Sequence, residues 1–475
     1  MSAARRVVVI GGGLAGIAAA LDCAAAGAEV TLLEVRRRLG GAAYSFDREG
    51  LEMDNGQHVF LRCCTAYRAL LERLGSHHLV AVQPRLEIPV LKPGAPAFLL
   101  RRGSLPAPLH LAGALARYPH MTRAQRLGAA RAALALMLLG RSARGRERER
   151  LDELSFGEWL ARHGQGAEAV SALWDLIALP TLNLPAAQAS LALGAFVFRT
   201  GLLASADAGD IGFHTGTLRE IIGRPAERAL LRAGVQVRLG WRAERLERTA
   251  QGFQVHGRGG RGERADADSL SAEAVVVAIP HGRAARLLEP LLGDRARALE
   301  LLGASPIVNL HVVYDRPVLG EPFAAGVGTP VQYLFDRSAA AGAPAGCQYL
   351  AVSLSGAERE MGMSVEELRE RYLPAMRALL PRARQARVES FLVTREHAAT
   401  FRAAPGVGAL RPGPQTALRG LVLAGAWTAT GWPATLEGAV ISGHAAADCA
   451  LRTLGIHHQP AALREGVAAE SGALA

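Results

Sequence analysis

A glycine-rich turn near the amino terminus constrains the fold of this chain more than any other feature. Residues 7–10 (VVVI) form a short apolar run, and Gly11, Gly13 and Gly16 follow it. The alanine-rich segment that comes next predicts a helix over residues 14–26. A buried strand, a tight turn with this glycine spacing and a helix are typical of the first unit of a doubly wound α/β fold that binds a dinucleotide.

The glycines of this turn are expected to have three separate functions. Gly11 permits the sharp turn, and Gly16 allows the helix to pack closely on the strand. Gly13 lets the backbone approach a pyrophosphate, which the N–H groups of Leu14 and Ala15 bind at the positive end of the helix. All five residues are therefore predicted to contact a cofactor.

A second predicted strand, residues 29–33, ends in Glu34. A carboxylate at the tip of this strand can accept hydrogen bonds from both ribose hydroxyls of an adenosine, and it disfavours a 2′-phosphate. We therefore expect Glu34 to bind the ribose. The structural alternative is a doubly wound fold with the same packing that binds no nucleotide.

The composition excludes several classes of function. The 475-residue chain has a net charge of +11, but its arginines are scattered and aromatic residues make up only 5%. Nucleic-acid binding requires clustered basic residues with aromatic residues between them, so no nucleic-acid partner is expected. The five cysteines are odd in number and lack metal-ligand spacing, so neither a disulfide framework nor a metal site is expected.

Neither a signal peptide nor a membrane-spanning segment is predicted, which favours a cytoplasmic protein. Dispersed arginines beside apolar helices favour peripheral contact with lipids at the inner face of the plasma membrane. Residues 111–139 show helical periodicity with arginines on the polar side. This segment is either a membrane-docking or substrate-entry element or an ordinary pair of core-facing helices.

The stretch EVRRRLGGAAYSF after the second strand carries Arg36, Arg38, Gly40 and Gly41. It resembles the FAD-binding segment of the amine oxidase and phytoene desaturase superfamily, in which basic residues and a Gly-Gly pair follow the acid. That superfamily usually has an arginine after the pair, where this chain has Ala42. The resemblance implies that FAD is the cofactor and that Arg36, Gly40 and Gly41 help to bind it.

Two later segments resemble other parts of the FAD site in this superfamily. The first is a predicted strand around Val237, whose backbone would meet the adenine edge. The second is a predicted strand that leads to Gly425, followed by a helix that begins near Ala434. Free N–H groups at a helix start favour negative charge, so Gly425, Thr435 and Leu436 are expected at the flavin ring.

The resemblance implies an α/β fold with a discontinuous, Rossmann-like FAD-binding domain and an inserted α+β substrate domain. The predicted FAD-binding domain comprises residues 1–84, 216–294 and 411–455. The predicted substrate domain comprises residues 85–215 and 295–410. Residues 456–475 lack periodicity and are expected to form a disordered tail.

Three motifs narrow the resemblance within the superfamily. They are MDNGQHVFLRCCTAYRALLERLG, LPTLNLPAAQAS and GWPATLEGAVISG, and together they resemble the hydroxysqualene dehydroxylases. This resemblance implies FAD-dependent reductive removal of the hydroxyl from hydroxysqualene, an isoprenoid lipid, to give squalene for bacterial hopanoid synthesis. It also implies NADPH or a reductase as the electron donor, and it leaves open an association with other enzymes of the squalene pathway.

In such a protein the segment DNGQH, residues 54–58, runs along the flavin. Gly56 then permits close backbone approach, and Gln57 and His58 line the ring. Loss of a hydroxyl beside a double bond requires a proton donor and a hydride from reduced flavin. His58 is the first candidate for the catalytic acid, because its ordinary pKa lies near neutrality, and Asp54 is the second. Asp54 can equally anchor the loop.

Three aromatic residues complete the expected substrate pocket. Trp427, Trp432 and Tyr333 can offer their faces to an allylic cation, an attraction of roughly 0.5–2 kcal/mol each. All three can also be ordinary core residues.

Three other functions remain open. A carotenoid-type desaturase would transfer hydride in the opposite direction, from substrate to oxidised flavin. An amine oxidase commonly places a lysine near the flavin, whereas Lys92, the sole lysine, lies outside the cofactor segments. A non-enzymatic prenyl- or lipid-binding protein of the same fold would bind no flavin.

Overall fold

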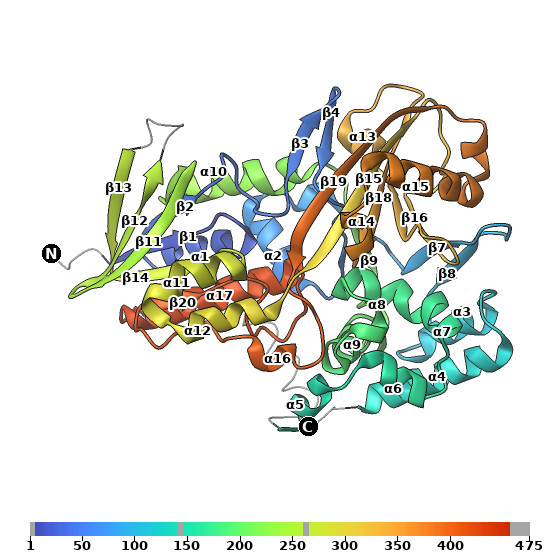
Figure 1. Ribbon diagram of the computed structural model, residues 1–475, viewed down its shortest axis with the longest axis horizontal. Coiled ribbons are helices and arrows are strands. Elements are labelled where there is room, and N and C mark those ends of the chain that lie inside the picture. Colours follow the sequence, from blue (N-terminus) through green and yellow to red (C-terminus); the bar gives the residue numbers. More distant parts are fainter. Residues whose placement is uncertain (1–4, 140–145, 260–265, 457–475) are drawn as a thin grey trace.

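The computed structural model describes residues 5–139, 146–259 and 266–456. Residues 457–475 of the predicted tail lie outside this part of the chain. A five-stranded sheet, a seven-stranded sheet and a layer of helices make up most of the fold (Figure 1).

The five-stranded sheet carries the glycine turn. Its strands run parallel in the order β10-β2-β1-β14-β20. Their bounds are β1 (Arg6–Ile10), β2 (Glu29–Glu34), β10 (Gln236–Leu239), β14 (Ala274–Val277) and β20 (Leu421–Leu423). Three distant parts of the chain therefore meet in one parallel sheet, which confirms the predicted α/β class.

Alternate residues of the strands face two apolar layers. Val7 and Val9 pack among the helices on one face, which are α1 (Leu14–Ala25), α2 (Thr65–Leu74), α10 (Arg224–Arg232) and α17 (Leu436–Thr453). Val8 and Ile10 belong to a second core, to which an antiparallel sheet and a helix contribute: β11 (Trp241–Thr249), β12 (Gly252–Gly259), β13 (Asp266–Ala272) and α11 (His281–Leu292).

Two of these helices touch at a glycine. A Cβ at Gly443 of α17 would lie 2.3 Å from the carbonyl oxygen of Ala15 in α1. α1 follows β1 and α17 follows β20, so both helices start at the carboxyl edge of the parallel sheet. The helix that was expected to begin near Ala434 begins at Leu436.

The seven-stranded sheet is mixed, in the order β19-β15-β18-β17-β16-β7-β8. Its strands are β7 (Glu87–Leu91), β8 (Phe98–Arg101), β15 (Ser305–Tyr314), β16 (Phe323–Gly326), β17 (Tyr333–Asp336), β18 (Gln348–Ser355) and β19 (Val388–Thr400). Helix α15 (Val365–Leu379) shares an apolar core with β15 and β18.

The helical layer lies at the lower right of Figure 1. It contains α3 (Ala112–Arg117), α4 (Arg123–Leu138), α5 (Arg146–Glu153), α6 (Phe156–Arg162), α7 (Ala167–Ala169), α8 (Asp175–Leu182) and α9 (Leu191–Phe198). The helices predicted within residues 111–139 are α3 and α4. The rings of Phe156, Trp174 and Phe198 pack on one another at the centre of this layer.

Short elements connect the larger layers. They are β3 (Ser45–Arg48), β4 (Leu51–Asp54), β5 (Phe60–Leu61), β6 (Val80–Val82), β9 (Ile211–His214), α12 (Asp294–Arg297), α13 (Ser338–Ala341), α14 (Glu358–Met361) and α16 (Val407–Leu410). β9 pairs with β5 and β6, so the end of one predicted substrate segment is hydrogen-bonded to the predicted FAD-binding segment 1–84. The domain boundaries stay a prediction. Within the described ranges, no helix has both the length and the hydropathy needed to cross a bilayer.

Candidate cofactor site

The candidate site lies at the carboxyl edge of the parallel sheet. β2 pairs with one side of β1 and β14 with the other, so the connections that leave this edge diverge at β1. A crevice at such a point is the usual ligand site of doubly wound sheets. The glycine turn, Glu34 and the loop before α17 all follow strands that end at this edge.

Each glycine of the turn has its own geometry. Gly11 has a φ of +112°, and a Cβ there would lie 2.4 Å from the Ala278 oxygen. A Cβ at Gly16 would lie 1.9 Å from the Gly11 oxygen, so helix and strand require a glycine at this contact. A Cβ at Gly13 would meet no atom closer than 3.7 Å, and no side chain caps the start of α1 at this residue. The first amides of α1, including those of Leu14 and Ala15, are therefore sterically open to an anion.

Glu34 is buried at the tip of β2. One carboxylate oxygen accepts the Gly12 N–H and the other accepts the Arg36 N–H, each at 2.7 Å. A carboxylate oxygen has two lone pairs, so each oxygen can still accept a ribose hydroxyl. Val237 lies on the edge strand β10, two residues before Leu239, which pairs with Glu34. The structure thus brings the predicted ribose and adenine residues to one corner of the sheet.

The Gly40–Gly41 pair holds a second turn against the first. Gly40 donates its N–H to the Gly12 oxygen at 2.8 Å, and Gly41 has a φ of +62°. Arg38 donates to the Gly41 oxygen at 2.9 Å, so this arginine already supports the turn. Arg36 is exposed. Gly40 and Gly41 are therefore required by the packing of the two turns, independently of any ligand.

Asp54 ends β4 and is 5% exposed. One of its oxygens accepts Ser45 Oγ at 2.7 Å and the Leu218 N–H at 2.9 Å, and the other accepts Arg337 Nη2 at 3.1 Å. Three donors point at this carboxyl group, so Asp54 acts here as a hydrogen-bond acceptor. Of the two roles that the sequence left open for Asp54, the geometry favours the anchor.

Polar atoms without hydrogen-bond partners lie in the DNGQH loop and on the strand that contacts it. Asn309 and Thr394 each donate to the Asn55 oxygen at 3.0 Å, which ties the loop to β15 and β19. Among the described residues, the buried atoms Gln57 Nε2 and Asn309 Oδ1 have no hydrogen-bond partner. A Cβ at Gly56 would lie 3.1 Å from Asn309 Nδ2. A buried donor and a buried acceptor without partners fit a ligand with polar ring edges, such as a flavin.

His58 is half-buried, and its Nδ1 lies 2.9 Å from the Gly56 oxygen. A carbonyl only accepts, so Nδ1 carries the proton and Nε2 of the neutral ring is an acceptor. Burial lowers the pKa of His58. The acid role of His58 stays a prediction, and the direction of this pKa shift opposes it.

A second histidine supports the same loop. His214 Nδ1 donates to the His58 oxygen at 2.7 Å, and its Nε2 accepts the Tyr67 hydroxyl at 2.8 Å. Burial and the neighbouring His58 lower the pKa of His214 to about 3. His214 is thus a neutral buried residue that positions His58.

The loop between β20 and α17 carries the remaining predicted cofactor residues. Gly425 has a φ of +140°, and Thr435 caps α17 by accepting the Gly438 N–H at 3.1 Å. Gly425, Thr435 and Leu436 are all half-buried. Arg411, which the sequence did not indicate, is buried and donates to three successive carbonyl oxygens of this loop, those of residues 426–428.

The three aromatic residues predicted to line the pocket each contact a different part of the protein. Trp427 is buried and donates Nε1–H to the Ile279 oxygen at 3.0 Å. Trp432 packs edge-on against Phe196, with ring centroids 5.0 Å apart. Tyr333 donates its hydroxyl to a carbonyl of α8 and stacks with neighbouring aromatics of the seven-stranded sheet. No ring contact joins any two of the three within the described part of the chain, so their shared role at a substrate stays a prediction.

Lys92 lies outside the candidate site. It follows β7, is exposed, and its side chain lies beside Gly328. The lysine that amine oxidases place near the flavin therefore has no counterpart in Lys92.

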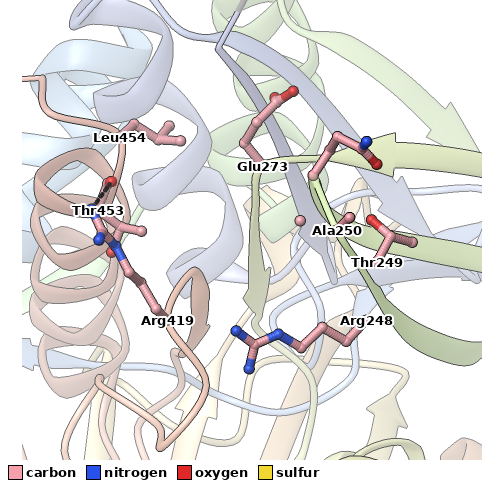
Figure 2. Close-up of a pocket in the computed structure, with 9 residues that line it drawn as sticks. Arg248, Thr249, Ala250, Glu273, Arg419, Thr453 and Leu454 are labelled. Atoms are coloured by element: carbon pink, nitrogen blue, oxygen red, sulfur yellow. Dashed lines mark hydrogen bonds between the residues drawn. The ribbon is translucent and has the colours of Figure 1, made fainter.

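A surface pocket of about 360 Å³ lies elsewhere, between the β11–β12 turn and the end of α17 (Figure 2). Its lining includes Arg248, Glu273, Arg419 and Thr453. Thr453 is the last residue of the 18-residue helix α17, so the pocket is about 27 Å along the helix from its cofactor-facing start. This pocket is not part of the candidate site.

The sequence profile that describes flavin containing amine oxidoreductases matches residues 14–451. The chain belongs to this family. Its cofactor is therefore a flavin, and the protein is a flavin-dependent oxidoreductase.

Full-length relatives bear out the resemblance drawn from the three motifs. Proteins named hydroxysqualene dehydroxylase are 30% identical in Rhodopseudomonas palustris and 29% identical in Sinorhizobium fredii, each over 94% of this chain and 98% of the relative. A zeta-carotene desaturase of Synechocystis is 23% identical over 94% of this chain and 97% of its own length.

Solved structures show the same fold. A putrescine oxidase bound to putrescine superposes with a TM-score of 0.69 at 19% identity, covering 95% of this chain and 98% of that chain. Cyclohexylamine oxidase from Brevibacterium oxydans has a TM-score of 0.69 at 19% identity, covering 94% and 99%. The predicted amine oxidase-like architecture is thereby confirmed.

Proposed function

We propose that the chain binds FAD and removes the hydroxyl group of hydroxysqualene, giving squalene for bacterial hopanoid synthesis. The observation that carries the proposal is the full-length match to proteins named hydroxysqualene dehydroxylase, at 30% identity over 94% of the chain. The matching coverage of 98% of that relative means that no large part of it lacks a counterpart here.

The residues that would hold FAD come from the carboxyl edge of the parallel sheet and from the DNGQH loop. The start of α1 would bind the pyrophosphate, Glu34 the ribose, and the DNGQH loop and the start of α17 the ring. Gln57 Nε2 and Asn309 Oδ1, which lack partners among the described residues, would hydrogen-bond to polar atoms of the ring.

Bound reduced FAD would supply a hydride to carbon. The chain must orient the substrate and provide for the departure of the hydroxyl. Neutral His58 can accept a hydrogen bond from that hydroxyl at Nε2, and it can donate a proton only after it has gained one. If His58 is the acid, kcat rises as the pH falls through its lowered pKa.

The decisive experiment is a product assay. The purified protein, loaded with FAD and reduced anaerobically with dithionite, is incubated with hydroxysqualene, and squalene is measured by mass spectrometry. Squalene formed in proportion to reduced flavin supports the proposal, and its absence contradicts it. Replacing dithionite by NADPH, with or without a reductase, identifies the electron donor.

A carotenoid-type desaturase is the second candidate, because zeta-carotene desaturases are also full-length relatives. The oxidised protein would then dehydrogenate phytoene or ζ-carotene and would not form squalene. A prenyl- or lipid-binding protein without enzymatic activity would purify without a flavin absorbance band. We also propose a cytoplasmic location with access to membrane lipid, because the substrate is itself a lipid.

A further inference from the structure

Helix α4 exposes three of its leucines to solvent. Leu127, Leu134 and Leu138 are 55%, 57% and 63% exposed. They are seven and four residues apart, so they share one face of the helix, which we call the outer leucine face. The opposite face is buried and consists mainly of alanine: Ala129, Ala132 and Leu136.

Two more exposed leucines precede α3, the helix that contacts α4. Leu105 and Leu109, in the segment before α3, are each 55% exposed. α3 contacts α4, and Arg126 of α4 donates to the Ala116 oxygen of α3. Single exposed leucines are ordinary on a soluble protein, but three on one helix face indicate a surface that a partner covers.

The chain segment that carries this face has charge of one sign. From Ile88 to Leu139 the chain contains no Asp or Glu, and its basic residues are Lys92, Arg101, Arg102, Arg117, Arg123, Arg126 and Arg131. Arg101 and Arg102 pair with acids of other segments. No salt bridge joins Arg123, Arg126 or Arg131 to another described residue, and Arg123 and Arg131 are exposed beside the leucines.

Among the described residues, one acidic side chain of another element hydrogen-bonds to α4. Glu168 accepts a hydrogen bond from Gln125 at 3.4 Å. Gln125 is half-buried, four residues before Ala129 on the inner side of the helix, so Glu168 does not neutralise the outer leucine face.

We propose that the outer leucine face docks on an anionic lipid surface. Exposed leucines flanked by unpaired arginines are the pattern of a helix that lies in the headgroup region, with its apolar side chains inserted and its cations at lipid phosphates. A second copy of this chain would bring the same arginines together, so charge disfavours self-association through this face. The inference goes beyond the proposed reaction and does not rest on it.

The experiment is co-sedimentation of the full flavin-loaded chain with vesicles, at 0.1 M salt. One vesicle contains neutral phosphatidylcholine alone, and the other contains seven parts of it with three parts of phosphatidylglycerol. We expect binding to the anionic vesicles, and at least tenfold weaker binding to the neutral ones. The double substitution L134Q/L138Q lowers the partition coefficient at least tenfold. The double substitution R123Q/R131Q lowers it about 25-fold, because each basic residue near an anionic surface contributes about fivefold.

Matched controls replace exposed leucines and arginines that are distant from α4 in the sequence. Leu231 and Leu301 are 75% and 69% exposed, and Arg228 and Arg232 are exposed on α10. L231Q/L301Q and R228Q/R232Q are expected to bind vesicles within twofold of the unchanged chain. Equal losses in test and control variants, equal binding to both vesicles, or no vesicle binding would overturn the proposal. A dimer in solution that L134Q/L138Q converts to a monomer, without vesicle binding, would assign the face to a second copy instead.

Discussion

Arg337→Met removes the cation that anchors the DNGQH loop. The Arg337 side chain is 11% exposed and that of its partner Asp54 is 4% exposed, with 3.1 Å between Nη2 and Oδ2. Arg337 also donates to the carbonyl oxygens of His214 and Gly216. Removal of one partner of a buried ion pair costs about 3–5 kcal/mol, because the other charge stays buried and unpaired. We expect the free energy of unfolding to fall by that amount.

The same substitution should weaken flavin binding, because Asp54 then loses one of the three donors that fix the loop. We expect the dissociation constant of FAD, measured by flavin fluorescence, to rise at least tenfold, and urea unfolding of the apoprotein to report the stability. Arg297→Met is the control: its side chain is 56% exposed and its partners Glu289 and Asp294 are 48% and 92% exposed, so its loss should leave the stability nearly unchanged. If Arg337→Met costs no more than this control, and FAD affinity is unchanged, the anchoring role is refuted.

Other substitutions separate binding from folding at the same site. Gly13→Ala should fold, since the protein has room for a Cβ there, but it should bind FAD at least tenfold more weakly, because the Cβ occupies the path of the pyrophosphate. Gly16→Ala should abolish soluble protein, because its Cβ would lie 1.9 Å from a backbone oxygen. Glu34→Gln should weaken FAD binding by about 1.5–3 kcal/mol, the range for hydrogen bonds to a charged group, as measured by the same fluorescence titration. The pKa of His214 is about 3 in the folded protein and near 6.5 when unfolded, so the unfolded state binds more protons between these values. Stability should therefore fall as the pH falls through this window, by up to about 1.4 kcal/mol per pH unit, and His214→Gln should flatten the slope in urea unfolding.

Each of these expectations has an opposite outcome. Unchanged FAD affinity in Gly13→Ala would mean that the backbone at this turn does not approach the pyrophosphate. Full affinity in Glu34→Gln would remove the ribose assignment. An identical pH slope in His214→Gln would show that other buried groups, such as His311 with a pKa of about 4, dominate the titration.

The parts of the site that depend on local sequence could be predicted. The strand, the glycine turn, the helix and Glu34 lie within 29 consecutive residues, from Arg6 to Glu34, so every contact among them joins residues of one short segment. A steric pattern of this kind needs no knowledge of the rest of the chain. The flavin family followed from the same residues and from the later motifs.

The supporting residues could not be found in this way. Arg337 reaches Asp54 across 283 residues of sequence, and Asn309 reaches Asn55 across 254. Only the complete sheet brings them together. Asn309 did leave one signal, because it is an amide within the apolar run SPIVNLHVVY, and a buried polar residue in such a run requires a partner.

The contact of Gly443 with Ala15 has a consequence for synthesis of the protein. The side of α1 that packs on α17 stays uncovered until residues up to about 450 have left the ribosome. The strand, turn and helix at the amino terminus are therefore exposed on one apolar helix face during most of translation. If the start of α17 holds the flavin ring, as proposed, cofactor loading follows the folding of the last strand and helix.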